Sequence, residues 1–385
     1  MRSSLGQRLT ASALAPSRDR LLACSVLSPN AADDRPFAEG VNGPHLEFYP
    51  DFPPVLLADD GSEGGGGGGG GRDGDASKLR VELTGSEMRM PVRHLRDLEK
   101  AIDFVNRLSR CVEGKAERWG TSLEYCGVIH DLAQLALVVR KVSLTIEDDV
   151  DLYRDYTRNP KFRFQTMPVA PAKDAKGNRL VSSGKTKFRV YVHGSEHIFK
   201  GHGRFRAFHI VSGSVTLSRI TMQDMGHAKA PDGGALKVEG SGSKVTVKKC
   251  TFIKCQARNG GAIGVGKEAR VLVKDLVFLS CKAGGYGGAI VNEGYLQFLD
   301  STAFDARSGS SGGGLANLPG SSAEVRESEF RQCYARRNAA AIFNSKGALV
   351  LLEDNLFELG ATGEGLTGSA AAFYQEQEDE EAQKR

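Results

Sequence analysis

The stretch Gly260-Gly261-Ala262-Ile263 decides the fold, because near copies of it recur along the chain at intervals of 25 to 27 residues. A repeat of this length is typical of a solenoid, in which each turn stacks on the next. A glycine loop that cradles a phosphate would occur once, so the recurrence indicates a corner of a stack. The other copies are Gly233-Gly234-Ala235-Leu236, Gly287-Gly288-Ala289-Ile290, Gly312-Gly313-Gly314-Leu315 and Ala339-Ala340-Ala341-Ile342.

Each repeat carries two strand patterns. One follows the corner directly, and the other alternates polar with apolar residues and ends on a large apolar residue, as in Val245 to Phe252. Such short strands can pair with the turns above and below at about 4.8 Å. The segment Leu296 to Phe304 is one residue longer than its counterparts, which suggests a bulge. We therefore predict an all-β solenoid with three inward columns. They are Met222, Phe252, Phe278, Phe304, Phe330 and Phe357; then Met225, Cys255, Cys281, Arg307, Cys333 and Gly360; and Ile220, Cys250, Leu276, Thr302, Ser328 and Asn355.

Four regions follow one another along the chain. Residues 1–77 mix Pro, Gly, Asp and Ser and contain a poly-Gly linker, so we predict a disordered N-terminal region. Residues 78–141 form a helical cap. Residues 142–375 form the parallel β-helix, which a polar insertion interrupts. Residues 376–385 form an acidic disordered tail, because charged side chains dominate them.

The predicted cap contains an amphipathic helix from Val92 to Val112, where apolar residues recur at steps of three and four. A second apolar segment, Val128 to Val139, predicts a second helix. An open end of a β-stack invites pairing with another chain. Because the first helix precedes the first strands, it is well placed to cover that end.

The hexapeptide Cys250-Thr251-Phe252-Ile253-Lys254-Cys255, together with the Gly-Gly-Ala-Ile corner, resembles the repeats of the polymorphic outer-membrane protein family and of related pectin-lyase-like proteins. The resemblance covers roughly residues 90 to 375 and implies a right-handed parallel β-helix with an extracellular or cell-surface location. The family usually has Asn three residues after the Phe, where this chain has Cys255, Cys281 and Cys333. Because this fold hosts lyases, hydrolases and adhesins, the resemblance implies no single activity.

Composition narrows the classes of partner. No apolar stretch reaches the roughly 18 residues that a membrane-spanning helix needs. The net charge of +4 is small for 385 residues, and no recognised nucleic-acid module is present, so sequence-specific nucleic-acid binding is not expected. The segment Met1 to Asn30 is rich in Arg and Ser, which fits an organellar transit peptide or an ordinary disordered terminus. The localisation and the oligomeric state stay open.

Two features bear on catalysis and metal binding. Gly201-His202-Gly203 matches a short motif of β-helix hydrolases that cleave polygalacturonate, but no acidic pair is placed one turn upstream of His202. A tight glycine turn is therefore favoured. An outward column carries both signs of charge, which favours a solvated face over a calcium cage. It holds Arg219, Lys249, Asp275, Glu327 and Asp354. We assign no catalytic residue, no cofactor and no metal ligand.

The cysteine spacing raises the question of a disulfide. Cys255 and Cys281 fall one turn apart, which is within disulfide range for their Cα atoms. In-register parallel strands hold the two Cβ atoms side by side, farther apart than in most disulfides. We therefore predict free buried thiols that pack as small hydrophobes.

Basic residues concentrate in one part of the chain, because residues 185–282 hold 18 Lys and Arg against 6 Asp and Glu. Lys248 and Lys274 should stack outward on adjacent turns, and such a like-charged pair is mildly destabilising. With Lys249 and Lys254 they form a candidate polyanion site. The alternative is a solubilising surface that the acidic tail balances.

The sequence favours a non-enzymatic scaffold for adhesion or for binding an extended ligand, such as an anionic polysaccharide or a cell-surface glycan. The alternative is a polysaccharide lyase or glycoside hydrolase that acts on acidic glycans. That activity would need three acidic side chains converging on one face within about 8 Å.

Overall fold

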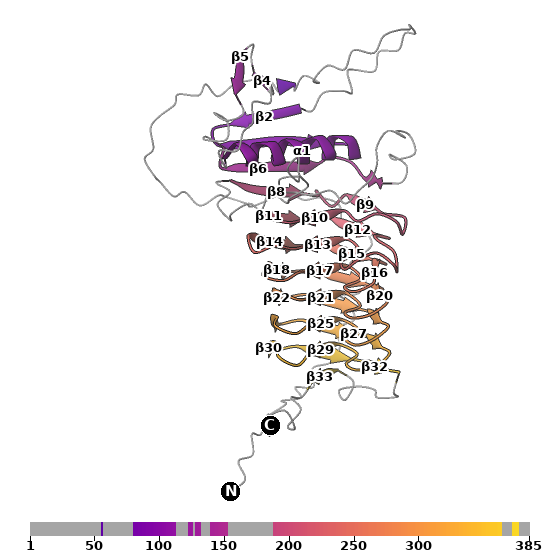
Figure 1. The fold of residues 1–385 in the computed structure, drawn as a ribbon. Helices are drawn as coiled ribbons and strands as arrows, with labels where there is room; N and C mark the ends of the chain where they lie inside the picture. Colours follow the sequence, from indigo (N-terminus) through magenta and orange to yellow (C-terminus); the bar gives the residue numbers. More distant parts are fainter. Residues whose placement is uncertain are drawn as a thin grey trace. The chain divides into compact units, whose positions relative to one another are not determined.

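A computed structural model describes residues 55–56, 80–112, 122–125, 128–131, 139–152, 188–363 and 372–376. All of them belong to one unit, residues 49–385. Within it, short strands stack turn upon turn (Figure 1). The predicted all-β fold is confirmed: it is a right-handed parallel β-helix preceded by a helix.

The turns build four sheets, of which two are long. Sheet 1 runs in the order β1 (Val55–Leu56), β2 (Arg80–Thr84), β3 (Glu87–Val92), β6 (Lys141–Ile146), β8 (Arg189–His193), β11 (Gly213–Ser218), β14 (Ser243–Lys248), β18 (Arg270–Lys274), β22 (Tyr295–Leu299), β26 (Ser322–Arg326) and β30 (Leu349–Glu353). Sheet 2 contains β7 (Val150–Asp151), β9 (Ile198–Lys200), β12 (Thr221–Gln223), β15 (Thr251–Ile253), β19 (Val277–Leu279), β23 (Thr302–Phe304), β27 (Glu329–Arg331) and β31 (Leu356–Glu358).

The other two sheets close each turn. Sheet 3 contains β16 (Gln256–Ala257), β20 (Lys282–Ala283), β24 (Arg307–Ser308), β28 (Tyr334–Ala335) and β32 (Ala361–Thr362). Sheet 4 contains β10 (Phe208–Ile210), β13 (Leu236–Val238), β17 (Ile263–Val265), β21 (Ile290–Asn292), β25 (Leu315–Asn317), β29 (Ile342–Asn344) and β33 (Phe373–Gln375).

The segment before the column combines one helix with antiparallel strands. Helix α1 spans Leu95–Val112, close to the predicted range, and packs beside β3 and β6 (Figure 1). The Oδ2 atom of Asp97 accepts hydrogen bonds from the backbone N–H groups of Arg93 and His94, which satisfies donors at the start of the helix. Its predicted apolar stripe is buried, namely Leu95, Leu98, Ile102, Val105 and Leu108.

The prediction of a second helix from Val128 to Val139 is wrong in the part of that segment that the structure describes. Residues Val128–Asp131 form β5, which pairs antiparallel with β4 (Ser122–Tyr125). The segment begins with two β-branched residues, which favour a strand in so short an apolar run. Residues 132–138, the predicted insertion at 153–185, most of the N-terminal region and the tail after Glu376 lie outside the described residues.

The strand register corrects the three predicted columns at one turn. Phe278 pairs with Ala303 and not with Phe304, and Ala303 in turn pairs with Phe330. The whole turn therefore shifts by one residue: Ala303, Ala306 and Ser301 point inward where the sequence predicted Phe304, Arg307 and Thr302. The other positions of these columns follow the predicted register.

The shift comes from a shorter corner, not from a bulge. Only residues 293–294 separate β21 from β22, whereas residues 266–269 separate β17 from β18 and residues 318–321 separate β25 from β26. This corner is therefore two residues shorter than its counterparts. The spacing between phenylalanines in the sequence hid the deletion, because Phe304 stands one residue after the true inward position. The prediction of a bulge in Leu296 to Phe304 is therefore wrong.

A second phenylalanine restores the core volume at the shifted turn. Phe298 of β22 occupies an inward position at which both neighbouring strands carry valine, Val273 and Val325. Its ring centroid lies 6.0 Å from that of Phe278 and 5.5 Å from that of Phe330. Strand β22 therefore carries a larger inward residue than its neighbours, and β23 carries a smaller one. The layer keeps its volume, and the aromatic stack continues.

The small-residue corners have the predicted steric cause. The first residue of each copy lies in the left-handed region, as at Gly287 with φ +65°. A Cβ atom on the next residue, Gly288, would lie 2.1 Å from the carbonyl oxygen of Gly313 on the following turn. Stacked corners therefore approach too closely for most side chains.

Candidate functional site

The outward face of sheet 1 carries two columns of basic side chains over its first turns. The register places Lys141 beside Arg189 and places Lys244 beside Arg270. A second column, at the other end of the same strands, places Lys248 beside Lys274. We call these six residues the basic face: Lys141, Arg189, Lys244, Lys248, Arg270 and Lys274.

Most of the basic face has no acidic partner. Lys141 Nζ lies 3.0 Å from Glu87 Oε1, and Lys274 Nζ lies 3.3 Å from Asp300 Oδ2. Within the described ranges, the other four side chains make no ion pair, and all four are exposed. Unpaired charges at successive turns produce a positive potential that salt screens only in part.

The spacing of these charges suits an extended ligand. Adjacent strands lie about 4.8 Å apart, and the four-residue step from Lys244 to Lys248 spans about 13 Å along a strand. Neutral side chains lie between the two columns, among them Tyr191, Thr216 and Thr246. The face therefore presents two parallel rows of cations, which Ser214 and Ser218 of β11 interrupt, with a strip of neutral side chains between them.

The structure separates the four predicted binding residues into two places. Lys248 and Lys274 share one column, as predicted, and Lys249 occupies the corner directly after Lys248. Lys249 and Lys254 both have left-handed backbone conformations, with φ of 52° and 53°, and they flank β15 at opposite ends. Lys254 therefore stands apart from the basic face.

Sequence reasoning missed four members of the basic face, because Lys141, which stands one residue before the inward Val142, was missed together with the next three. Arg189, Lys244 and Arg270 each stand one residue before the first inward valine of their strands. The period-two alternation already marked that position as outward. Comparing it from turn to turn would have revealed the first column.

The outward column of corner residues, which directly follows the strands of the basic face, has its basic residues at one end and its acidic residues at the other. We call it the corner column. The register adds Asp300 to the five predicted residues, so the order along the column is Arg219, Lys249, Asp275, Asp300, Glu327 and Asp354. The two bases come first and the four acids follow, so the signs do not alternate. Asp300 raises the pKa of the Glu327 carboxyl, chiefly through a hydrogen bond between the two side chains. Among the described residues, no group of three or more His, Cys, Asp or Glu could hold a metal ion.

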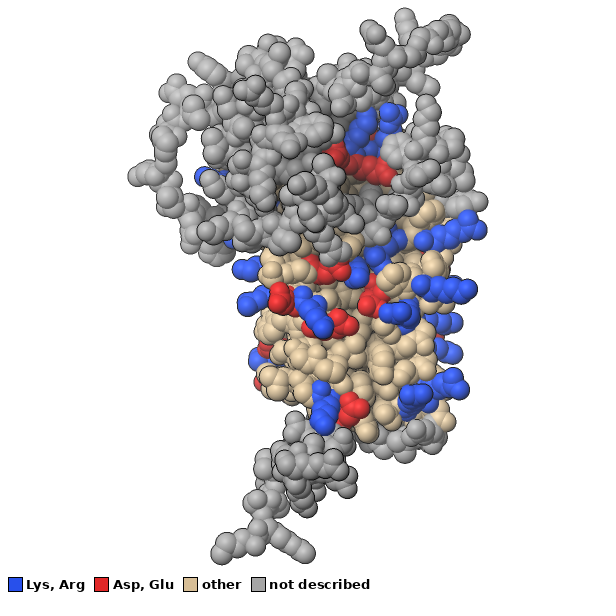
Figure 2. Space-filling model, in the orientation of Figure 1, with Lys and Arg blue, Asp and Glu red and all other residues tan. Residues whose placement is uncertain are grey.

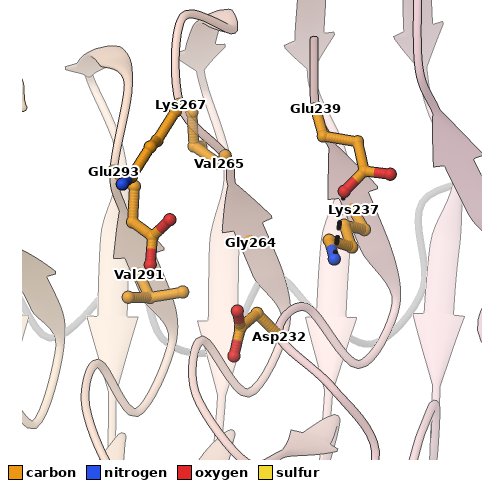
Figure 3. Close-up of a pocket in the computed structure, with 9 residues that line it drawn as sticks. Asp232, Lys237, Glu239, Gly264, Val265, Lys267, Val291 and Glu293 are labelled. Carbon is orange, nitrogen blue, oxygen red and sulfur yellow. Dashed lines mark ion pairs between the residues drawn. The ribbon is translucent and has the colours of Figure 1, made fainter.

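A cavity of about 230 Å³ opens on the outer face of sheet 4 (Figure 3). Its floor is Gly264, where a Cβ atom would lie 2.9 Å from Gly233 N. Arg206 holds the loop over this floor, because its guanidinium donates to the carbonyl oxygens of Pro231, Asp232 and Gly233. The lining residues are Asp232, Lys237, Glu239, Gly264, Val265, Gly266, Lys267, Val291 and Glu293.

The charges at this cavity are largely fixed by neighbours. Glu239 lies 3.1 Å from Lys237 Nζ and 2.8 Å from His209 Nε2. Although burial opposes ionisation, these partners lower the pKa of Glu239 to about 2. Burial also lowers the pKa of His209. Asp232 accepts a hydrogen bond from the Asn259 side chain.

The glycine turn at His202 contains an acidic neighbour that the sequence did not reveal. His202 Nε2 lies 3.1 Å from Asp151 Oδ1, although 51 residues separate them. Strands β7 and β9 pair directly, so the long insertion between them is a detour. One acid, Asp151, therefore lies one turn upstream of His202, where the sequence predicted no acidic pair. The expected tight turn is present, with φ of 50° at His202 and 65° at Gly203.

The cysteines of the column are free thiols, as predicted. Cys250, Cys255, Cys281 and Cys333 are all buried and unbridged. The Cys255 and Cys281 thiols each donate to a backbone carbonyl of the preceding turn, those of Met222 and Phe252. Burial raises the pKa of Cys250 and of Cys333 to about 12, so these thiols are poor nucleophiles.

Compared with known proteins, the chain matches no family model, and it has no significant match among curated proteins or solved structures. In the part of the chain that the structure describes, no helix has the length and apolar character needed to cross a membrane.

Proposed function

We propose that this protein is a non-enzymatic binding scaffold and that its basic face holds an anionic polysaccharide. The carrying observation is that four exposed cations of the basic face, Arg189, Lys244, Lys248 and Arg270, make no ion pair within the described residues. Stacking like charges on adjacent strands costs stability. A bound polyanion would neutralise that repulsion and release its own counterions.

The two rows of cations favour an extended ligand over a small one. The rows follow the column axis, so a polymer lying along the axis would meet cations on several turns, with β11 contributing Ser214 and Ser218 instead. Figure 2 shows that Lys and Arg side chains also project from both edges of the column in that view. The acids of the corner column lie farther along the axis, which limits the ligand to the first turns.

We also infer a functional likeness to the polymorphic outer-membrane and pectin-lyase-like proteins. The support is the recurring small-residue corner and the Cys-x-Phe strand motif. Adhesion at a cell surface is the function that this likeness suggests, and it agrees with a scaffold that binds glycans.

A second candidate function, hydrolysis or lysis of an acidic glycan, is favoured by the cavity on sheet 4. Three carboxylates line it: Asp232, Glu239 and Glu293. A glycoside hydrolase needs one carboxylic acid whose pKa is raised, so that it can donate a proton. The pKa of Glu239 is instead lowered to about 2, which fits an ion-pair partner better than a proton donor.

The binding proposal is tested by titrating the protein with heparin and with polygalacturonate over a series of salt concentrations. The double variant Lys244→Gln/Lys248→Gln should bind roughly thirtyfold more weakly, since each basic side chain near an anionic surface contributes about 1 kcal/mol. The matched control Arg336→Gln/Arg337→Gln removes the same charge from exposed positions away from the basic face and should bind normally. Binding that ignores salt, or equal losses in both variants, would refute the proposal.

The enzymatic alternative needs a separate assay. Release of reducing ends or of unsaturated products from anionic polysaccharides, lost in Glu239→Gln and retained in Lys244→Gln/Lys248→Gln, would support catalysis at the cavity. Absence of turnover with intact binding would leave the scaffold as the function.

A further inference from the structure

The two ends of the column differ. At one end α1 and the antiparallel strands β2 and β3 adjoin sheet 1. At the other end β30, β31, β32 and β33 are the outermost strands of their sheets, and among the described residues no further strand pairs with them. An edge strand presents a row of unpaired N–H and C=O groups, so this end, as far as the described residues show, is a template for another chain.

The last turn carries leucines at outward positions that are polar in the turn before it. Leu349 replaces the position of Ser322, Leu351 that of Glu324, and Leu356 that of Glu329. These outward leucines are 71%, 51% and 44% exposed. Strands that are apolar on both faces are typical of sheets covered on both sides.

The corner of the last turn provides independent evidence for a partner surface. Leu359 is 67% exposed and has φ of 53°. A bulky apolar residue is unfavourable in this conformation. Earlier turns fill the same corner with polar residues, which are Asp224, Lys254, Ser280, Asp305 and Gln332. An exposed leucine held there points to a partner surface.

We propose that the last turn is a self-association surface, on which a second copy of this chain stacks its own last turn. At the other end sheet 1 continues into β3, β2 and β1 with α1 beside it, whereas at this end each of the four sheets stops at the last turn, so the two copies meet end to end around a two-fold axis. Such a contact uses the same patch on both copies and closes at a dimer. A two-fold axis perpendicular to β30 would run the two β30 strands antiparallel.

The ion pairs of the last turn permit a second copy at this end. Glu353 Oε2 lies 3.2 Å from Arg326 Nε, and Glu358 Oε2 lies 3.2 Å from Arg331 Nη1, although each arginine also pairs with an acid on its own strand, Glu324 or Glu329. These contacts reduce the repulsion between the copies across the axis. Residues 377–385 hold six charged residues and a single alanine, so this segment lacks the apolar side chains that would match the leucines.

The test is the mass of the full chain in solution, measured by light scattering and sedimentation from about 1 to 100 µM, a range that brackets micromolar dissociation constants. We expect a dimer whose maximum dimension in X-ray scattering is about twice that of the monomer, because the copies meet end to end. The double variant Leu351→Glu/Leu356→Glu should be a monomer with unchanged circular dichroism. It places at each position the residue that the preceding turn already carries there.

The matched control is Leu272→Glu, which changes the same outward position of sheet 1 on an earlier turn and should remain a dimer. A wild-type monomer at all concentrations, a dimer that survives the double variant, or open-ended assemblies would each overturn the proposal. If the double variant fails to fold, the proposal is tested by the mass of the Leu359→Gln variant in solution, which should fall toward the monomer, and by hydrogen exchange of wild-type β30. Exchange at β30 must slow as protein concentration rises, and unchanged exchange would overturn the proposal.

Discussion

An early turn and the last turn of this column share one backbone but differ on the outside. Strand β14 presents Lys244 and Lys248 to solvent, whereas β30, four strands later in sheet 1, presents Leu349 and Leu351. The inward residues are two valines in β14 and a valine and a leucine in β30, so they are aliphatic in both strands. The inward positions therefore define the fold, and the outward positions vary with the use of each turn.

The same contrast extends into one inward column. Val238 and Val265 occupy it in the first turns, and Asn292, Asn317 and Asn344 occupy it afterwards. The asparagines are fully buried and hydrogen-bonded to one another, with Nδ2 to Oδ1 distances of 2.7 and 2.6 Å. One half of the column thus fills this corner with apolar volume, and the other half fills it with a polar ladder.

The largest expected effect comes from breaking the feature that both halves share, the aromatic stack. Phe298→Ala removes the ring that joins the earlier phenylalanines to the later ones, so unfolding should become easier by about 3–5 kcal/mol. The measurement is chemical denaturation followed by circular dichroism.

Phe304→Ala is the matched control, because this ring lies outside the core. It should cost less than about 1 kcal/mol, as surface substitutions usually do. If Phe304→Ala were the more damaging of the two, the register described for this turn would be wrong.

This turn shows how far the sequence predicted the fold. Periodicity alone predicted the solenoid, the inward columns and the helix α1, since buried apolar residues must recur at the period of the element that contains them. It failed at Ala303, because a two-residue deletion in one corner was hidden by an outward phenylalanine. The compensating residue, Phe298, lies on another strand, and only the three-dimensional packing connects the two.

The second effect tests the polar ladder of the later turns. Asn317→Ala removes a side chain that donates to Asn344 Oδ1 and to the Leu349 carbonyl and that accepts from Asn292 and Ser321. It leaves several buried polar groups without partners, so we expect a loss of about 2–3 kcal/mol.

The isosteric change Asn317→Leu separates loss of volume from loss of hydrogen bonds, because leucine fills the space but accepts no bond. It should be nearly as damaging as Asn317→Ala. Full rescue by leucine would show that the ladder acts through volume alone, and the contrast with Val265 would then lose its meaning.

The candidate site could be predicted less completely than the fold. The column of Lys248 and Lys274 followed from period two, and Lys254 was misplaced because a left-handed corner turns the chain between β15 and β16. The pair of His202 and Asp151 could not be predicted, because a long insertion hides the direct pairing of β7 with β9. Contacts across such detours carry no periodic signal in the sequence.

The smallest effect is a pH dependence confined to the first turns. On the outer face of sheet 4 the early turns carry His209 and Lys237, and the later turns carry Ala316 and Phe343. Folding lowers the pKa of His209 through burial, and neighbouring cations lower that of Glu239 to about 2. A lowered pKa means that the unfolded chain binds protons more readily than the folded chain.

Stability from both groups is therefore complete above pH 6.5 and decreases on acidification. The contribution of His209 falls first, below its unfolded pKa of 6.5, and that of Glu239 falls between pH 4.5 and about 2. Glu239→Gln should cost about 1 kcal/mol at pH 7, because its ion pairs are partly screened by solvent, and it should flatten the decrease below pH 4.5.

Hydrogen exchange at separate pH values locates the effect along the column. Protection of the β10 and β13 amides should fall on acidification in the wild type, whereas β25 and β29 should change little, since their outward residues do not titrate. Equal loss of protection in both groups of strands would mean that the column unfolds as one unit. The chemical difference between its two halves would then act on their surfaces and leave their stabilities coupled.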